Sequence, residues 1–342
     1  MSFARLVPFG WDDRARAAYG EVAGAAHVPG RVVRVDRISC VVATPDGERI
    51  ARFVDLPAVG DWVALAEDPD DEQSVIAAVA PRWSALTRHD ADRERVQVLA
   101  ANVDVVMISA PGDRPSAARV ERETVLGWES GAQPLVIVTK ADVAPPGYVE
   151  ELRARLVGVE VIVTSAASGQ GVDAVAAALA PCRTAVMLGP SGAGKSTLIN
   201  ALLGEERLAT GAVRDDDRRG RHTTSSRELV VVPTGGVLID TPGVRTLGLG
   251  SVEEGLDAAF ADVVALAAQC RFGDCAHDGE PGCAVLAAVA SGELDAARLE
   301  HYRHLESEII GDGRVVDHAA AKAKREEDKR VQRQARSDRS GR

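Results

Sequence analysis

The sequence contains the stretch Gly189-Pro190-Ser191-Gly192-Ala193-Gly194-Lys195-Ser196, which matches the pattern G-x-x-x-x-G-K-S of a phosphate-binding loop. An apolar run, 185–188, precedes it as a buried strand would, and a helical pattern follows it. The glycines let backbone N–H groups converge on phosphate oxygens, and the helix N-terminus adds its positive dipole end. We expect Lys195 to contact the β- and γ-phosphates, Ser196 to bind Mg²⁺, and Thr197 to line the site. With this context, a glycine-rich turn that binds nothing is the weaker interpretation.

A base-recognition motif, Thr139-Lys140-Ala141-Asp142, follows the apolar run 134–138. The Asp142 carboxylate can accept hydrogen bonds from the guanine N1–H and N2–H₂ groups, while the Lys140 stem covers the ring. Adenine lacks this pair of donors and would leave the carboxylate unpaired, so the motif favours GTP over ATP. Ser165 and Ala166 follow a further apolar run, and they fit a companion loop whose backbone N–H contacts the guanine O6.

The parts that would contact the γ-phosphate come after the phosphate-binding loop. The motif Asp240-Thr241-Pro242-Gly243 ends an apolar strand, where Asp240 can hold Mg²⁺ through water and the Gly243 N–H can contact the γ-phosphate. Residues 211–226 are polar, charged and bounded by glycine, as expected of a segment that orders around γ-phosphate and Mg²⁺. Thr223 or Thr224 is the expected magnesium-linked hydroxyl.

The expected catalytic set is Lys195, Thr223 and His222. Many GTPases use a glutamine near this point to orient the attacking water. Here Val244 and Arg245 follow the motif, so we expect slow intrinsic hydrolysis that a partner accelerates. His222 is the candidate for positioning water, and a histidine that merely packs or faces solvent is an equally weighted alternative.

The motifs occur in a rearranged order, because the guanine-reading motif normally lies after the phosphate-binding loop and here lies before it. Their surroundings predict an α/β domain. Near-continuous apolar runs are typical of parallel strands that crossover helices bury on both faces. We expect such strands near 103–109, 134–139, 159–164, 184–188, 229–232 and 236–240, with helices over 119–128, 148–156, 172–180 and 195–203.

The N-terminal part has a different texture. Residues 1–27 carry scattered apolar anchors without a period, and short β-branched segments from about 30 to 81 are separated by turn signals. Several short strands at this spacing predict a small barrel, with 81–92 as a linker. The expected units are an N-terminal extension 1–27, a barrel 28–92, a nucleotide-binding domain 93–250, a zinc-binding helical domain 251–318 and a basic tail 319–342.

A cysteine–histidine cluster follows the nucleotide motifs. Cys270, Cys275, His277 and Cys283 give the pattern C-x4-C-x-H-x5-C, a complete tetrahedral set for Zn²⁺ with no position left for water. The expected role is therefore structural, with one zinc per chain. A redox thiol cluster is the less favoured alternative. The two other cysteines, Cys40 and Cys182, lie in or beside apolar segments and are expected in the core.

Composition limits the remaining classes. The chain has 342 residues and a formal net charge of −11, with no apolar run long enough for a membrane span. The N-terminus carries no secretory signal pattern, so a cytoplasmic protein is expected. Residues 318–342 hold nine Lys or Arg against four Asp or Glu. This tail suits an anionic partner, and a merely solubilising tail has equal weight.

Taken together, these motifs resemble the circularly permuted GTPases, and more closely the ribosome small subunit-dependent GTPase A family, also called RsgA or YjeQ. The resemblance covers about 28–310. It rests on the rearranged order, on Gly220-Arg221-His222-Thr223-Thr224, on Asp240-Thr241-Pro242-Gly243-Val244-Arg245 and on the cysteine cluster. The 59–62 turn is similar to that of the family's N-terminal OB-fold barrel.

The resemblance implies a factor in late maturation of the small ribosomal subunit. Its expected partners are the 30S subunit and its 16S rRNA, its ligands are GTP and GDP with Mg²⁺, and monomer is the default state. The subunit would stimulate hydrolysis, and hydrolysis would favour release. The main departure from the family is Thr139 in place of asparagine, which puts a side-chain contact to the neighbouring loop in doubt.

Two other functions are weighed. One is a GTP-dependent switch on another ribosomal or RNA target, which the barrel and the cysteine cluster disfavour. The other is an RNA-binding protein with a degenerate nucleotide site. The intact Lys195, Ser196, Asp240 and Asp142 argue against it.

Overall fold

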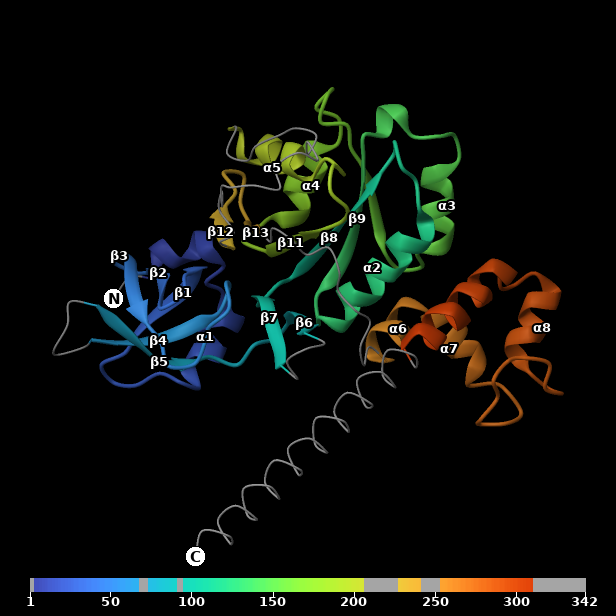
Figure 1. Ribbon diagram of the computed structural model, residues 1–342, viewed down its shortest axis with the longest axis horizontal. Helices are drawn as coiled ribbons and strands as arrows, with labels where there is room; N and C mark the ends of the chain where they lie inside the picture. The colour runs from blue at the N-terminus through green and yellow to red at the C-terminus, as the bar shows by residue number, and fades with distance from the viewer. Residues whose placement is uncertain (1–2, 68–72, 91–94, 206–226, 241–252, 310–342) are drawn as a thin grey trace, which may run out of the picture.

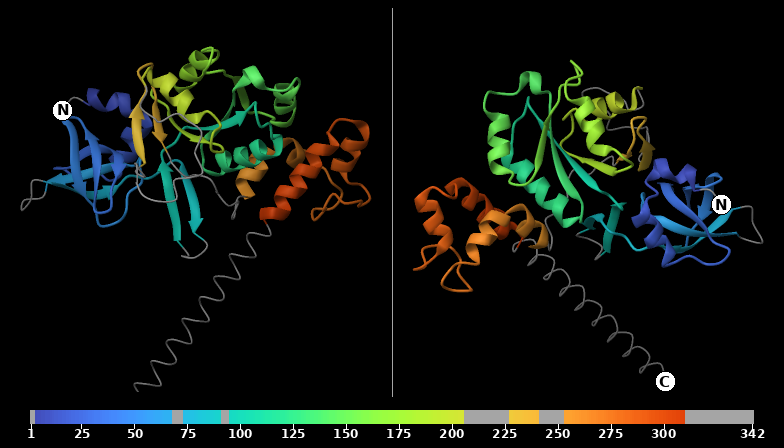
Figure 2. Two further views of the ribbon diagram at one scale, coloured as in Figure 1. Left: turned by 45° about the horizontal axis from the view of Figure 1, so that its top comes forward. Right: turned by 180° about the vertical axis from the view of Figure 1, so that it is seen from behind.

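The structure is a computed structural model that describes residues 3–67, 73–90, 95–205, 227–240 and 253–309. Three parts follow one another across the molecule. A β-barrel lies at one end, an α/β sheet lies in the middle, and a group of helices lies at the other end, beside α2 and α3 (Figure 1). The same arrangement is visible from behind and from above (Figure 2). Within the described ranges no helix is both long and apolar enough to cross a lipid bilayer.

Five short strands close the predicted barrel. They pair in the order β1-β2-β3-β5-β4, and β4 returns to β1. All contacts are antiparallel except the parallel pair β3–β5. The strands are β1 (Val28–Val35), β2 (Ser39–Thr44), β3 (Gly47–Arg52), β4 (Trp62–Glu67) and β5 (Ser74–Val79). The apolar residues that alternate along them form one core, which includes the fully buried Cys40 as expected.

The N-terminal residues cover this barrel. The 3-10 helix η1 (Ala4–Phe9) and the helix α1 (Asp13–Gly20) bring Leu6 and Trp11 into a buried cluster. The Trp11 ring packs edge-on against Trp62 of β4, with ring centroids 4.9 Å apart. The scattered apolar anchors in the sequence are therefore one side of a packed interface.

The segment 81–92, expected to be a linker, instead contributes a strand, so that prediction is wrong. β6 (Ala85–Asp90) pairs antiparallel with β7 (Arg95–Ala101) in a separate two-stranded sheet. Leu86 and Leu99 are buried, but polar residues dominate β6 and hide its pattern. This hairpin also crosses the expected domain boundary at 92/93.

The predicted parallel sheet is confirmed. Its order is β10-β9-β8-β11-β13-β12, and only β12 runs antiparallel to its neighbour in this part. The strands are β8 (Val105–Pro111), β9 (Gln133–Thr139), β10 (Glu160–Val163), β11 (Thr184–Leu188), β12 (Glu228–Val231) and β13 (Val237–Asp240). β12 also pairs with β1 of the barrel, so barrel and α/β part share one continuous hydrogen-bonded sheet.

Helices cover both faces of this sheet. α2 (Ala117–Glu129) and α3 (Tyr148–Arg155) contribute to the apolar cluster on one face, and α4 (Val172–Leu179) and α5 (Lys195–Leu203) to the cluster on the other. Neighbouring strand residues alternate between the two: Val106 lies in the first cluster and Met107 in the second. All four helices fall within a residue or two of the predicted ranges.

The barrel and the α/β part are joined by a buried arginine, Arg31 of β1, whose side chain is 1% exposed. Its guanidinium donates to the backbone carbonyls of Phe9 and Asn102 and, at 2.8 Å, to the Thr184 hydroxyl at the start of β11. The charged group also lies over the Trp62 ring. Burial lowers the pKa of Arg31 to about 10, although nearby carboxylates oppose the shift. One side chain therefore contacts the N-terminal segment, the barrel and the central sheet.

The C-terminal helices pack on α2 through their own apolar cluster. They are α6 (Glu253–Ala259), α7 (Ala261–Ala267), α8 (Ala284–Ser291) and a helix over 296–309. Along the last helix, Leu299, Leu305 and Ile309 are buried in this cluster, as is Leu294 just before the helix, and Tyr302 packs edge-on against Phe260.

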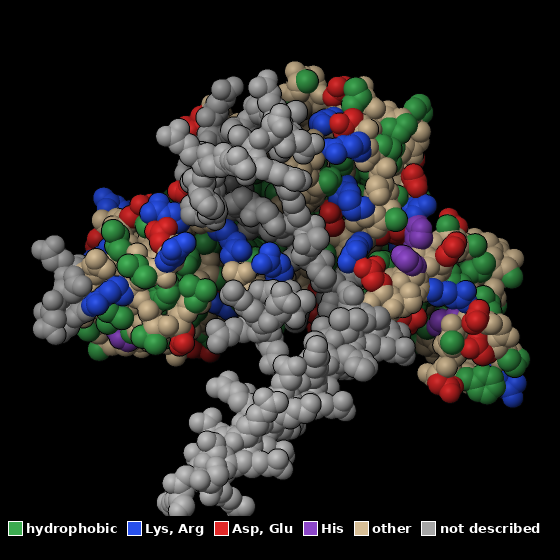
Figure 3. Space-filling model, viewed as in Figure 1, with side chains coloured by type: hydrophobic (Ala, Val, Ile, Leu, Met, Phe, Trp, Pro, Cys, Tyr) green, Lys and Arg blue, Asp and Glu red, His purple; other side chains and the backbone are tan. Residues whose placement is uncertain are grey.

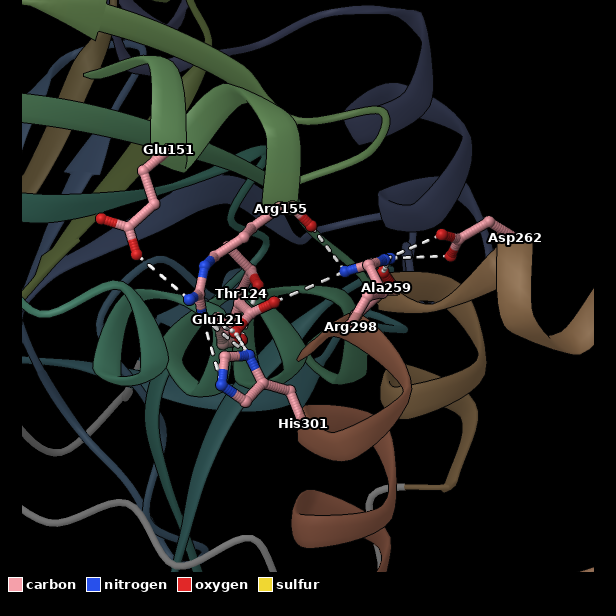
Figure 4. A network of polar contacts seen from close by, with 8 residues as sticks. All are labelled: Glu121, Thr124, Glu151, Arg155, Ala259, Asp262, Arg298 and His301. Atoms are coloured by element: carbon pink, nitrogen blue, oxygen red, sulfur yellow. Dashed lines mark hydrogen bonds and ion pairs between the residues drawn. The ribbon is translucent and has the colours of Figure 1, made fainter. Parts of the chain in front are cut away.

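A buried carboxylate, Glu121 of α2, lies at this second joint (Figure 4). Its carboxylate lies 2.7 Å from His301, 3.5 Å from Arg298 and 3.7 Å from Arg155 of α3. Arg298 also makes two hydrogen bonds, of 2.7 and 2.8 Å, to Asp262 of α7. Burial raises the pKa of Glu121, and the three basic side chains oppose that shift. A single network thus ties α2 and α3 to the C-terminal helices.

Candidate nucleotide and metal sites

The fold brings the rearranged motifs together. β9 and β11 are parallel strands separated only by β8, so the loops that follow them leave the same edge of the sheet. The guanine-reading motif follows β9, and the phosphate-binding loop runs from β11 into α5. Ligand sites in open α/β sheets form at this carboxyl edge. The two motifs can therefore line one pocket, although their order along the chain is rearranged.

The phosphate-binding loop has the backbone that its glycines permit. Gly192 and Gly194 adopt φ of 74° and 85°, and Gly194 immediately precedes α5. A Cβ on Gly189 would lie 2.8 Å from the Ser109 Cβ of β8, so only glycine fits this close approach. The Lys195 ammonium donates to the carbonyls of Gly189 and Pro190, at 2.7 and 2.8 Å. Lys195 therefore lies folded over the loop that it is expected to serve.

Three further side chains hold the next three carbonyls of the loop. Arg114 donates to Ser191 O at 2.9 Å, Lys140 to Gly192 O at 2.8 Å, and Thr139 to Ala193 O at 2.6 Å. All five carbonyls from Gly189 to Ala193 thus face side-chain donors. Since C=O and N–H point in opposite directions across a trans peptide, this arrangement directs the loop's N–H groups the other way.

Thr139, which stands where the family has asparagine, still makes a side-chain contact to the neighbouring loop. Its hydroxyl bridges the guanine-reading motif and the phosphate-binding loop through the carbonyl of Ala193. The Thr139 side chain is 3% exposed, so this bond forms away from water. A hydroxyl thus supplies a link between the two loops.

A cavity of about 200 Å³ lies between these loops. It is lined by the predicted base-binding residues Thr139, Lys140, Asp142, Ser165 and Ala166, together with Thr164, Ala167, Gly194, Thr197 and Leu198. Ser165 Oγ donates to Asp142 Oδ1 at 2.7 Å and so orients the carboxylate. Lys140 forms an ion pair of 2.7 Å with Asp113, and this hydrogen bond lowers the pKa of Asp113. The geometry suits a planar base with two N–H donors, as guanine has.

Several predicted site residues lie outside the described residues, namely His222, Thr223, Thr224 and Gly243. Asp240 is described through its backbone, which ends β13 directly beside β11. Ser196 and Thr197 lie in the first turn of α5, beside the phosphate-binding loop. Of the predicted magnesium set, Ser196 therefore lies on the helix that follows β11, and the Asp240 backbone ends the strand beside β11.

The four predicted zinc ligands converge. Their ligand atoms all lie within 4.8 Å of one another. His277 Nδ1 lies 3.6 Å from Cys270 Sγ and 3.4 Å from Cys283 Sγ, and these two sulfurs are 3.9 Å apart. Tetrahedral zinc with bonds of about 2.3 Å to sulfur and 2.0 Å to nitrogen requires about 3.8 Å between sulfurs and about 3.5 Å from sulfur to nitrogen. The residues fit the ion.

Backbone groups support this cluster. The N–H of Ala284 points at Cys270 Sγ and that of Leu286 at Cys283 Sγ, at 3.3 and 3.4 Å. Such N–H donors stabilise thiolates and orient metal ligands. His277 adopts a left-handed φ of 58°, and Arg303 of the last helix donates to its carbonyl. When bound, zinc would join the glycine-rich loop to the start of α8, while Arg303 links that loop to the helix over 296–309.

Comparison with known proteins settles the family. The model of the RsgA GTPase domain matches residues 79–250. Small ribosomal subunit biogenesis GTPase RsgA of Streptomyces coelicolor is 46% identical over 337 residues, covering 94% of this chain and 90% of that protein. The chain belongs to the RsgA GTPase family. It is accordingly a GTP-hydrolysing enzyme with a circularly permuted GTPase fold.

Other relatives agree with this RsgA assignment. The protein of the same name from Opitutus terrae is 41% identical and covers 95% of both chains. Among solved structures, YjeQ from Thermotoga maritima matches with a TM-score of 0.63 and 24% identity, covering 83% of this chain and 99% of that one. YloQ, described as a circularly permuted GTPase, matches with a TM-score of 0.61. These two likenesses show the fold.

Two residues beside the candidate nucleotide site were not predicted from the sequence. Asp113 and Arg114 lie in the loop after β8, which is the strand between the two motif-bearing strands. Polar residues at the carboxyl end of an apolar strand were the available signal, because such ends line the ligand edge of a parallel sheet.

Proposed function

We propose that this GTPase binds the small ribosomal subunit and assists its late maturation. In this proposal the subunit stimulates GTP hydrolysis, and hydrolysis favours release. The observation that carries it is the guanine-sized cavity joined to an ordered phosphate-binding loop, in a chain whose relatives over nearly its full length are named for small-subunit biogenesis. Contact with ribosomal subunits implies a cytoplasmic location, and monomer is the proposed state.

In the proposed nucleotide complex, Asp142 and the Ser165–Ala166 loop bind the guanine, and Lys140 covers its ring. The N–H groups of 189–196 bind the phosphates, and Lys195 leaves its two loop carbonyls to neutralise β- and γ-oxygens. Ser196, Asp240 and Thr223 hold Mg²⁺. His222 orients the attacking water, and the subunit completes the site, since the residues directly after Gly243 are Val244 and Arg245 and not glutamine.

The proposed RNA contacts come from the two ends of the molecule. The barrel's strand order, in which β3 pairs with β5 and β1 with β4, supports an OB-fold, a class that binds nucleic acids. Lys and Arg side chains are visible over the barrel and on the side where it meets the GTPase part (Figure 3). They suit phosphate contacts with structured 16S rRNA. We propose a structural Zn²⁺ for the C-terminal helical domain 251–318. We also propose a barrel domain 28–92 and a GTPase domain 93–250, with the hairpin of β6 and β7 spanning their junction.

The test is steady-state GTP hydrolysis by the purified chain alone, with 30S subunits, with 50S subunits and with free RNA. We expect a large increase with 30S subunits only. Stimulation by 50S subunits instead would favour the alternative, a GTP-dependent switch on another ribosomal target. Lys195→Ala should abolish hydrolysis in every condition, and wild-type turnover by this variant would disprove the assigned site.

A further inference from the structure

The phosphate-binding loop contains a turn whose central peptide has two available orientations. Ala193 N donates to Pro190 O at 3.3 Å, which closes a four-residue turn, and Gly192 at its third position has a φ of 74°. A positive φ at the third position but not at the second, Ser191, is typical of a type II turn, and a type I turn differs mainly by rotation of the central peptide. That peptide joins Ser191 to Gly192. Glycine tolerates both orientations, so the loop itself does not fix the direction of the Gly192 N–H.

One side chain outside the loop restrains this peptide. Arg114 Nη2 donates to the Ser191 carbonyl at 2.9 Å. It also lies 3.2 Å from the position that a Cβ on Gly192 would occupy, so the guanidinium closely covers the glycine. A peptide rotation would turn the Ser191 carbonyl away from Arg114 and break the hydrogen bond.

The segment that carries Arg114 is itself braced. Arg114 N donates to Pro111 O at 3.2 Å, and Gly112 N donates to Thr139 O at 2.8 Å. Asp113 is paired with Lys140 of the guanine-reading motif. A Cβ on Gly112 would lie 2.5 Å from the Lys140 carbonyl, so this segment packs tightly on that motif. The backbone segment that carries Arg114 is therefore held in place against the guanine-reading motif.

We propose that Arg114 is a positioning residue for nucleotide binding. By holding the Ser191 carbonyl, it keeps the Ser191–Gly192 peptide in the type II orientation, so that the Gly192 N–H faces the phosphate chain of a bound guanine nucleotide. Lys140 and Thr139 belong to the guanine-reading motif, whereas Arg114 belongs to no nucleotide-binding motif identified in the sequence. The inference rests on the proposed binding of GTP and GDP at this site.

The experiment compares Arg114→Met, which removes the donor and keeps most of the side-chain volume, with Arg114→Lys, which restores a donor. Arg49→Met is the matched control, because Arg49 is a surface arginine of the barrel paired with Asp46. Dissociation constants for fluorescent GDP and a non-hydrolysable GTP analogue are measured at low and high salt, together with melting temperatures. We expect Arg114→Met to weaken both nucleotides about five- to tenfold, with Arg114→Lys recovering most of the loss.

Comparing low and high salt distinguishes a role of Arg114 in positioning the loop from direct attraction between its charge and the phosphates. A loss caused by peptide orientation persists at high salt, whereas attraction of an exposed arginine for phosphate is screened. Unchanged affinity in Arg114→Met, or a loss that disappears at high salt, would overturn the inference. Failure of the wild-type chain to bind GTP would instead overturn the proposed function.

Discussion

The two ends of the molecule are attached to its GTPase part by opposite means. At the barrel, one buried cation, Arg31, donates to backbone carbonyls and a hydroxyl that carry no formal charge. At the C-terminal helices, one buried anion, Glu121, faces two arginines and a histidine from two elements. Both central groups are nearly inaccessible to water, yet the groups that they contact directly differ in charge.

This difference bears on what each joint loses when its central group is removed. Neutral acceptors left without a donor cost a moderate desolvation penalty, typically about 1–3 kcal/mol. Buried cations left without their anion cost more, about 3–5 kcal/mol. Backbone pairing between β1 and β12 also supports the barrel joint. The C-terminal joint relies on side chains and apolar packing, so we expect it to be the more easily disrupted.

Zinc removal should cause the largest loss of stability, and the loss should be confined to the C-terminal helices and their joint with α2. Small zinc modules of this ligand type gain about 10–16 kcal/mol from the metal near neutral pH, so a chelator should unfold the cysteine-rich loop and expose the 296–309 helix. Hydrogen exchange measured by mass spectrometry checks this, with Cys283→Ser as the genetic equivalent and Cys182→Ser as the control thiol. Unchanged protection after chelation would mean that the cluster holds no metal.

Glu121→Gln should destabilise the C-terminal joint by about 3–5 kcal/mol, because Arg155 and Arg298 keep their charges without the anion. Urea unfolding monitored at the C-terminal helices provides the measurement. Glu308→Gln is the matched control, since its ion pair with Arg122 lies at the same joint but is partly exposed. That change should cost at most about 1 kcal/mol. Equal effects in the two variants would contradict the role of burial.

Arg31→Met should cost about 1–3 kcal/mol, since it leaves the Phe9 and Asn102 carbonyls and the Thr184 hydroxyl short of a donor. Thermal and urea unfolding of the barrel report the loss. Arg34→Met on the same strand is the control, because Arg34 is partly exposed and its pair with Asp36 is long, at 3.5 Å. A larger loss in Arg31→Met than in Glu121→Gln would reverse the comparison.

The smallest expected effect is on how the unfolding free energy of the C-terminal joint changes at acid pH. Burial alone would raise the pKa of Asp262, but the hydrogen bonds and positive charge of Arg298, together with hydrogen bonds from backbone N–H groups, outweigh burial and lower it. A lowered carboxylate pKa adds stability above the unfolded value of about 3.9, and that stability disappears as pH falls through the lower folded value. Asp262→Asn should therefore flatten the fall in unfolding free energy between neutral pH and about pH 3. Asp257→Asn, an exposed site on the neighbouring helix, should leave the profile unchanged.

Much of this architecture could be predicted because its signals are local. Continuous apolar runs predict the parallel strands. Glycine spacing predicts the phosphate-binding loop, which the structure places between β11 and α5. The cysteine spacing likewise predicted four ligands that do converge. In each case, the residues that form the feature lie close together in the sequence, so their pattern is visible without the fold.

The parts that sequence did not reveal depend on contacts between distant segments. Arg31 reads as an ordinary polar residue on a barrel strand until the fold places it against Thr184, 153 positions later. Glu121 reads as one charge on an amphipathic helix until Arg298 and His301 reach it. The strand β6 was missed for a related reason, because its polar residues become strand-like only through pairing with β7.

The pairing of β12 with both β13 and β1 has a further consequence for the sheet as a whole. An open parallel sheet ends in exposed N–H and C=O groups to which strands of other chains can add. In this molecule the barrel occupies one of the two ends of the GTPase sheet and so shields it from such association. A GTPase domain excised without its barrel would present that end to solvent, and its tendency to aggregate should rise even if its nucleotide pocket were intact.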